Sequence, residues 1–253
     1  MILGAYGISL RVEGTDTACL ALLRQRAAAL GWIDNGASAA DLDYAIVERE
    51  DGFDLRCNGE TLHSAMDSAS IADLFENHAK IALALRAPHH VFVHAGVVAW
   101  RGGAIVVPGR SRAGKTTLVE ALVRAGAEYY SDEFAVLDER GRVHPYAIPL
   151  SIREERGRAA TPVDALGGRA GTIPIAVAHI VVTEYREGSR WRPRAVSPAQ
   201  AMLALMDNTV AARERTPDRT MPVLRRAVEG ARTVRSRRGD AHAMAKALLE
   251  AIA

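Results

Sequence analysis

Alternating apolar and polar positions predict a small α+β unit in the first quarter of the chain. Ile8 to Val12 alternate as a strand with one buried face does, and Thr17 to Leu30 have helical spacing. Two more apolar runs around a glycine-containing turn predict a β-hairpin: Tyr44 to Val47 and Phe53 to Arg56. We assign residues 1–65 to this N-terminal unit.

A helix and then a sheet-rich region follow. Ser70 is suited to cap a helix whose apolar residues form one stripe, and Pro88 is expected to close it. From His89 onward, β-branched runs broken by glycine indicate a buried sheet. The predicted class is therefore α/β (α+β), with a second domain over residues 66–253.

Within that second domain the apolar runs predict several strands and helices. Two strands joined by a short Gly-containing turn are expected to pair antiparallel: Val91 to Ala99 and Gly103 to Val107. Further strands are predicted near Glu128 to Tyr130 and over Ile173 to Glu184. Residues 197–208 and 221–252 are expected to be mostly helical.

Composition and charge narrow the classes of protein. The chain has 253 residues, 49% of them apolar and 25% charged, which is ordinary for a folded globular protein. Its net charge of +2 gives no field that favours nucleic acid or a membrane surface as a partner. Residues 211–240 hold nine arginines against four acidic residues, which we interpret as a solvated helix face. Two cysteines and the absence of a signal-peptide pattern favour a cytoplasmic location.

One glycine-rich segment carries a specific chemical signal. Residues Gly109 to Thr116 match the pattern G-x-x-x-x-G-K-[ST] of a phosphate-binding loop (Walker A), between a predicted strand and a predicted helix. Glycines let backbone N–H groups turn towards phosphate oxygens, and the helix N-terminus adds the positive end of its dipole. The expected nucleotide-binding residues are Gly109, Arg110, Ser111, Arg112, Ala113, Gly114, Lys115, Thr116 and Thr117.

Lysine usage supports this interpretation of the loop. The chain contains only three lysines beside 29 arginines, and yet a lysine stands in the loop at position 115. A compact ammonium fits between phosphate groups, whereas a planar guanidinium does not. We expect Lys115 to reach the β- and γ-phosphates of ATP, and the Thr116 hydroxyl to ligate Mg²⁺.

Two adjacent carboxylates follow the strand after the loop. Because α/β sheets bind ligands at the carboxyl ends of their strands, Asp132 and Glu133 are expected beside the phosphate-binding loop. A kinase needs a carboxylate near Mg²⁺ and a base for the acceptor hydroxyl. We assign the base to Asp132 and the metal to Glu133 together with Thr116, and leave the reverse division of the two acids open.

The order of these motifs resembles the catalytic domain of the HPr kinase/phosphorylase family. The matching segments are His94-Ala95-Gly96-Val97-Val98, the loop from Gly109 to Thr117, and Tyr130-Ser131-Asp132-Glu133. The resemblance covers roughly residues 89–155. It implies the phosphoenolpyruvate carboxykinase type of P-loop fold with a mixed sheet, ATP and Mg²⁺ as cofactors, and transfer of phosphate to a serine or threonine of a protein.

Two catalytic assignments come from the resemblance by position. His94 matches a histidine near the acceptor, and Arg153 lies where the family has an arginine-bearing loop, whose guanidinium would stabilise charge on the transferred phosphoryl group. The expected catalytic residues are thus Asp132, His94, Lys115 and Arg153. Judged by the residues alone, His94 also fits a packed core position and Arg153 a surface salt bridge.

The chain also departs from the family. Glu133 stands where the family usually has a second aspartate, and no L-E-x-R-G-L-G-I-like segment follows the acids, which makes HPr a doubtful acceptor. Similar divergent kinases phosphorylate a serine of natural-product precursor peptides such as lasso peptides, and a peptide acceptor of that kind fits this chain. Family members often form oligomers, so a homo-oligomer is compatible with the resemblance.

The sequence leaves open two other functions and the role of residues 155–172. The loop would serve equally in an ATP-sensing regulator that transfers nothing, or in a small-molecule kinase of the same fold. Residues 155–172 contain several glycines and arginines without an apolar period, which fits either a mobile lid over the nucleotide or an exposed connector.

Overall fold

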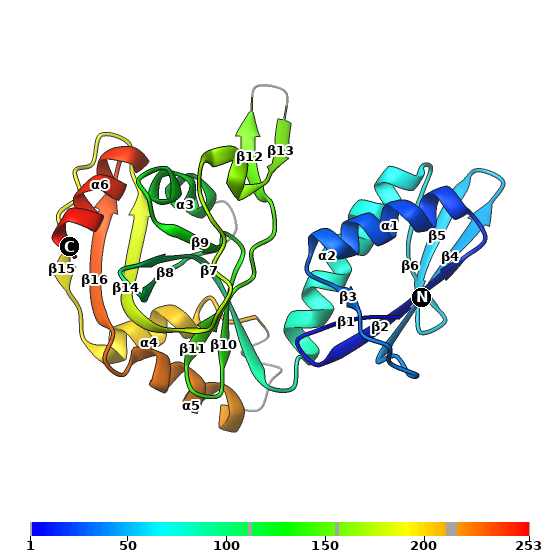
Figure 1. Cartoon of the computed structure of the whole chain (residues 1–253), viewed down its shortest axis with the longest axis horizontal. Helices are drawn as coiled ribbons and strands as arrows, with labels where there is room; N and C mark the ends of the chain where they lie inside the picture. Colours follow the sequence, from blue (N-terminus) through cyan, green and yellow to red (C-terminus); the bar gives the residue numbers. More distant parts are fainter. Residues whose placement is uncertain (1, 111–112, 155–156, 211–216, 253) are drawn as a thin grey trace. The chain divides into compact units, whose positions relative to one another are not determined.

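A computed structural model of the chain describes residues 2–110, 113–154, 157–210 and 217–252, and the side chains of residues 153, 154, 157, 158 and 217 are outside that description. The chain forms two compact units, Met1–His89 and His90–Ala253 (Figure 1). Both units combine helices with sheets that contain parallel and antiparallel strand pairs. The predicted α/β class is confirmed.

The N-terminal unit is a sheet of six strands with two helices. Its elements are β1 (Ile2–Ala5), β2 (Ile8–Gly14), α1 (Thr17–Ala29), β3 (Ile33–Asp34), β4 (Leu42–Arg49), β5 (Gly52–Cys57), β6 (Glu60–Ala65) and α2 (Ser68–Arg86). The strand order is β3-β1-β2-β4-β5-β6, in which β2 and β4 run parallel and β4 and β5 form the predicted hairpin.

The second helix belongs to this unit. The apolar side of α2 packs on α1, β5 and β6 and buries Ile71, Phe75 and Leu83. The compact units therefore divide after His89, whereas the sequence placed the boundary after residue 65. The capping residue of α2 also differs from the expectation. Asp67, three residues before Ser70, is the N-cap, and its carboxylate accepts a hydrogen bond from the Ser70 N–H at 2.8 Å.

The C-terminal unit alternates strands and helices. Its elements are β7 (His90–Trp100), β8 (Gly103–Pro108), α3 (Lys115–Arg124), β9 (Glu128–Ser131), β10 (Phe134–Asp138), β11 (Arg142–His144), β12 (Leu150–Glu154), β13 (Gly157–Thr161), the 3₁₀ helix η1 (Val163–Leu166), β14 (Ile175–Tyr185), β15 (Arg194–Ala195), α4 (Pro198–Met206), α5 (Pro217–Val228), β16 (Arg232–Arg238) and α6 (Ala241–Ala251).

One mixed sheet organises this unit. Its strand order is β11-β10-β7-β8-β14-β16-β15, and β9 pairs with β7 beside this path. The predicted antiparallel pairing of β7 with β8 is confirmed, while β8, β14 and β16 run parallel. Because β11 also pairs with β14, the strands from β11 through β10, β7 and β8 to β14 form a closed ring.

Helices cover both faces of the sheet, as the side-chain alternation along the strands requires. Val93, Ala95 and Val97 of β7 join the core beneath α4 and α5, and Val98 joins the core beneath α3 and α6. Figure 1 shows the two helix pairs on opposite sides of the strands. No helix in the described ranges is long and apolar enough to cross a membrane.

Residues 221–252 are mostly helical, as predicted, but a strand that was not expected lies between α5 and α6. Residues 232–238 form β16, which pairs in parallel with β14 from His179↔Arg232 to Tyr185↔Arg238. Arginines of this stretch therefore lie on a strand, and the interpretation of residues 211–240 as a helix face is wrong for this part. The strand over residues 232–238 was not expected, because its frequent arginines obscure the alternation of apolar and polar residues that is typical of a strand.

Residues near the predicted lid form regular structure. Strands β12 and β13 pair as a separate antiparallel ladder from Leu150↔Thr161 to Glu154↔Gly157, and η1 follows. Residues 155 and 156 lie outside the described residues. The described part of residues 155–172 thus contains the second strand of this ladder, β13, and the 3₁₀ helix η1.

Candidate active site

The glycine-rich loop connects β8 to α3 as the sequence predicts. The loop leaves β8 with the Gly109 N–H donating to the His94 carbonyl at 3.0 Å. Gly114 caps α3 in the left-handed conformation, with φ of 77°, a geometry that glycine adopts without steric cost. Ser111 and Arg112, two of the expected nucleotide-binding residues, lie outside the described residues.

A second glycine determines how closely α3 approaches the sheet. A Cβ on Gly96 of β7 would lie 2.5 Å from the Val119 methyl group of α3, closer than atoms can approach. The glycine of the His94-Ala95-Gly96 segment thus lets the first turns of α3 rest on β7. This contact places the helix N-terminus over the middle of the sheet, beside the end of β9.

Lys115 lies at the mouth of the loop. Its Nζ donates to the Gly109 carbonyl at 2.8 Å and to the Arg110 carbonyl at 3.0 Å. Burial lowers the pKa of Lys115, and the nearby carboxylates of Glu133 and Asp132 oppose that shift. The ammonium is therefore partly desolvated, which strengthens its attraction for anionic ligands, while the two acids offset part of its charge.

Asp132 is the most buried carboxylate of the site, with 7% exposure. One of its oxygens accepts a hydrogen bond from the Thr116 hydroxyl at 2.8 Å, and the other accepts from the Tyr129 hydroxyl at 3.0 Å. Burial raises the pKa of Asp132, and the hydrogen bonds from Thr116 and Tyr129 counteract the rise. The single Tyr129 hydroxyl proton is shared between Asp132 and the Ile148 carbonyl, which lies 2.8 Å from the hydroxyl oxygen.

The pair Thr116 and Asp132 fits Mg²⁺. A hydroxyl and a carboxylate are hard oxygen donors of the type that Mg²⁺ prefers. In the described part of the chain no group of three or more His, Cys, Asp or Glu side chains is arranged to hold a metal ion. That suits Mg²⁺ at nucleotide sites, because Mg²⁺ is usually held there by one or two carboxylates, phosphate oxygens and water.

Glu133 and His94 lie on facing segments beside Lys115. The Glu133 carbonyl accepts a hydrogen bond from the Ala95 N–H at 3.2 Å, and His94 is opposite Phe134 in the β7–β10 ladder. The imidazole of His94 lies 4.9 Å from the Phe134 ring, centre to centre. Burial and the Lys115 charge both lower the pKa of His94, so this side chain is neutral at neutral pH.

The structure thus brings five predicted residues together: His94, Lys115, Thr116, Asp132 and Glu133. The backbone of Arg153 lies on β12, opposite Arg158 of β13, and its side chain is outside the described part. The roles assigned to these residues from the sequence stay predictions.

One residue of the site was missed by sequence reasoning. Arg238, at the end of β16, is only 3% exposed and donates to the carbonyls of Gly114 at 2.8 Å and Ala113 at 3.2 Å. Its guanidinium also lies 5.4 Å from the centre of the Tyr185 ring, and burial lowers its pKa. No motif surrounds Arg238, because 124 residues separate it from Gly114 and only the sheet brings the two together.

Comparison with known proteins finds similarity among solved structures but not among family models or curated proteins. No protein-family model matches the chain, and no curated protein matches it. Among solved structures, the chain is similar to the HPr(Ser) kinase/phosphatase from Coxiella burnetii, with 14% identity and a TM-score of 0.36, over 64% of this chain and 93% of that chain. A similarity with so low an identity and TM-score does not indicate function, so the function is inferred from the contacts within the site.

Proposed function

We propose that the protein is an ATP- and Mg²⁺-dependent kinase that transfers the γ-phosphate to a serine or threonine hydroxyl of a protein or peptide. The hydrogen bond of 2.8 Å between Thr116 and Asp132 carries this proposal. It joins the helix that follows a phosphate-binding loop to the carboxylate at the end of the neighbouring strand. In P-loop enzymes these two positions hold Mg²⁺.

The loop and its partners account for nucleotide binding. Backbone N–H groups at the start of α3 face the phosphates, and the Lys115 ammonium neutralises charge on the β- and γ-phosphates. Thr116 and Asp132 would hold Mg²⁺, which supplies further neutralisation of the transferred group. Arg238 donates to two carbonyls of the loop and so holds its last turn against β16.

The hydrogen bonds of Asp132 favour Glu133 as the base. Both Asp132 oxygens already accept hydrogen bonds from fixed donors, while Glu133 is adjacent, half-buried and close enough to influence the Lys115 ammonium. We therefore propose the reverse of the first assignment, with Asp132 at the metal and Glu133 as base. Asp132 remains the other candidate, because a carboxylate of raised pKa also suits a base.

The transfer step replaces one bond at the γ-phosphorus with another. The acceptor hydroxyl oxygen forms a bond to the γ-phosphorus, the bond from that phosphorus to the bridging oxygen breaks, and ADP leaves. The hydroxyl proton passes to the Glu133 carboxylate. Neutral His94, on the strand facing Glu133, would orient the acceptor hydroxyl, and Arg153 is retained as a candidate to stabilise the transferred group.

Transfer of labelled γ-phosphate tests the proposal. The whole chain is incubated with Mg²⁺ and ATP and a panel of acceptors that includes HPr and serine-bearing precursor peptides of the lasso type, with Lys115→Ala in parallel. We expect label on a protein or peptide, lost in Lys115→Ala and without Mg²⁺. Nucleotide binding without label on any acceptor would favour an ATP-sensing regulator, and label on small molecules alone would favour a small-molecule kinase.

A further inference from the structure

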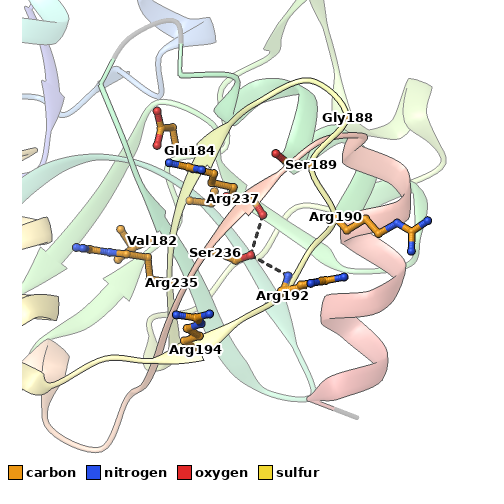
Figure 2. A pocket seen from close by; sticks show the side chains of 11 residues that line it. Val182, Glu184, Gly188, Ser189, Arg190, Arg192, Arg194, Arg235, Ser236 and Arg237 are labelled. Carbon is orange, nitrogen blue, oxygen red and sulfur yellow. Dashed lines mark hydrogen bonds between the residues drawn. The ribbon is translucent and has the colours of Figure 1, made fainter.

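A groove rich in arginine lies on the C-terminal unit, apart from the residues used above (Figure 2). Its walls come from the ends of β14 and β16, from β15, and from the segment that connects β14 to β15. The charged residues that line it are Arg190, Arg192, Arg194, Arg235, Arg237 and Glu184. The groove is thus lined by five cations and a single carboxylate.

Glu184 is the one carboxylate among the described residues that line this groove. Some arginines elsewhere on the surface form ion pairs, for example Arg26 with Asp73 at 2.9 Å and Arg142 with Asp138 at 2.9 Å. Among the residues that the structure describes, none of the five groove arginines forms an ion pair. The chain as a whole carries a net charge of only +2, so the positive charge is concentrated at this place.

The strand register increases the repulsion. Arg194 of β15 lies directly opposite Arg235 of β16 in an antiparallel pair. Like charges in directly opposed positions destabilise a sheet. The connecting segment is nevertheless held in place, because the Arg192 N–H donates to the hydroxyl of the buried Ser236 at 2.9 Å. A fixed arrangement of mutually repelling cations favours an anionic ligand, which would relieve the repulsion.

The groove also lies at the same edge of the sheet as the nucleotide site. The parallel strands β8, β14 and β16 end on this side, and β8 leads directly into the phosphate-binding loop. Glu184 is opposite Arg237 in the β14–β16 ladder, and the next residue along β16, Arg238, contacts the Gly114 carbonyl. A ligand in the groove would therefore lie at the same edge of the sheet as the phosphate-binding loop, although Arg237 and Arg238 occupy opposite faces of β16.

We propose that this groove binds an acidic segment of the polypeptide acceptor, an inference that rests on the proposed kinase function. Carboxylates match exposed guanidinium groups, which bind them through paired hydrogen bonds. Single-stranded nucleic acids are usually held by aromatic rings on which bases stack, and the described lining residues include no aromatic ring. An acidic peptide therefore fits the groove better than a nucleic acid.

Direct binding tests this inference without any transfer. A fluorescein-labelled peptide of alternating Glu and Ser is titrated with the whole chain in the absence of nucleotide, and anisotropy is measured. We expect binding that weakens as salt is raised, and a dissociation constant that rises about tenfold in Arg235→Gln/Arg237→Gln. A peptide of alternating Gln and Ser should not bind.

A matched variant controls for net charge. Arg24→Gln/Arg140→Gln removes the same charge from exposed positions outside the groove and should change the dissociation constant by less than about twofold. Equal binding of the acidic peptide to both double variants would overturn the inference. So would tighter binding of a single-stranded oligonucleotide of the same charge, which would assign the groove to nucleic acid.

The outcome is separable from that of the kinase proposal. The titration contains no ATP, so a protein that transfers no phosphate can still bind the peptide, and an active kinase can fail to bind it. If a phosphorylated acceptor is found, adding an acidic tail to it should lower KM with little change in kcat. That gain should disappear in Arg235→Gln/Arg237→Gln and persist in Arg24→Gln/Arg140→Gln.

Discussion

The proposed nucleotide site and the arginine groove both concentrate charge at one edge of the same sheet, but they differ in how far opposite charges offset one another. In the nucleotide site, Lys115 lies close to Asp132 and Glu133, and burial shifts the pKa of both Lys115 and Asp132. In the groove, exposed arginines face one carboxylate. Balanced, desolvated charges suit chemistry on a bound group, whereas exposed charges of one sign suit docking of a partner.

The largest expected effect is a loss of phosphate transfer, which substitutions in the proposed nucleotide site should cause and substitutions in the groove should not. Lys115→Ala and Glu133→Gln should each lower phosphate transfer by about 10² to 10⁴, because they remove the phosphate cation or the proposed base. Arg235→Gln/Arg237→Gln should leave transfer to a peptide without acidic residues unchanged. Single-turnover assays with labelled ATP measure both, and full transfer by Glu133→Gln alone would return the base to Asp132.

The next largest effect is on the free energy of unfolding and concerns the contact between α3 and Gly96 of β7. Gly96→Ala should destabilise the fold by about 2 kcal/mol, because the added methyl group meets the Val119 side chain. Combining it with Val119→Ala should cost less than the two single changes added together, since the second change makes room for the first. Urea unfolding measures the three variants, and strict additivity would show that α3 does not rest on Gly96.

Two neighbouring arginines of β16 offer a matched pair. Arg238→Met removes the donors to the Gly114 and Ala113 carbonyls and should weaken ATP binding about tenfold. Arg237→Met, on the groove side of the same strand, should leave ATP binding within about twofold of the parent. Isothermal titration calorimetry measures both, and equal losses would mean that the two faces of β16 are not functionally distinct.

The smallest effect concerns stability and pH. Burial raises the pKa of Asp132, so an ionised carboxylate costs more in the folded state than in the unfolded chain, and above that pKa Asp132→Asn should stabilise the fold by about 1 kcal/mol. As the pH falls through the raised pKa, the folded parent takes up a proton before the unfolded chain does, and the advantage of the variant shrinks. Thermal unfolding across pH tests this, and an advantage that grows on acidification would contradict it.

The expectations that held at the nucleotide site came from contiguous residues. The loop with its strand and helix lies within residues 103–124, so local pattern was enough to place it. His94 and the pair Asp132-Glu133 were expected near the loop, and the structure brings them beside Lys115. Sequence spacing did not, however, tell which acid faces Thr116, because that depends on how β9 meets the start of α3.

Other expectations failed where long-range pairing decided the structure. Residues 232–238 form a strand only because β14 and β15 lie on either side of them, and the helix over Ser68–Arg86 joins the N-terminal unit because α1 and β5 bury its apolar side. Such pairings override local preference, since the free energy comes from surfaces that are distant in sequence.

The sequence by itself determined the α/β class and a glycine-rich loop between a strand and a helix, with a lysine and a hydroxyl in the loop and two acids after the next strand, because each depends on short patterns of residue type. Only the tertiary structure decided that Asp132 binds Thr116, that Arg238 supports the loop, and that arginines from three segments line one groove. The physical reason is that these contacts join residues from separate strands, and strand order follows from the burial of whole faces rather than from any local signal.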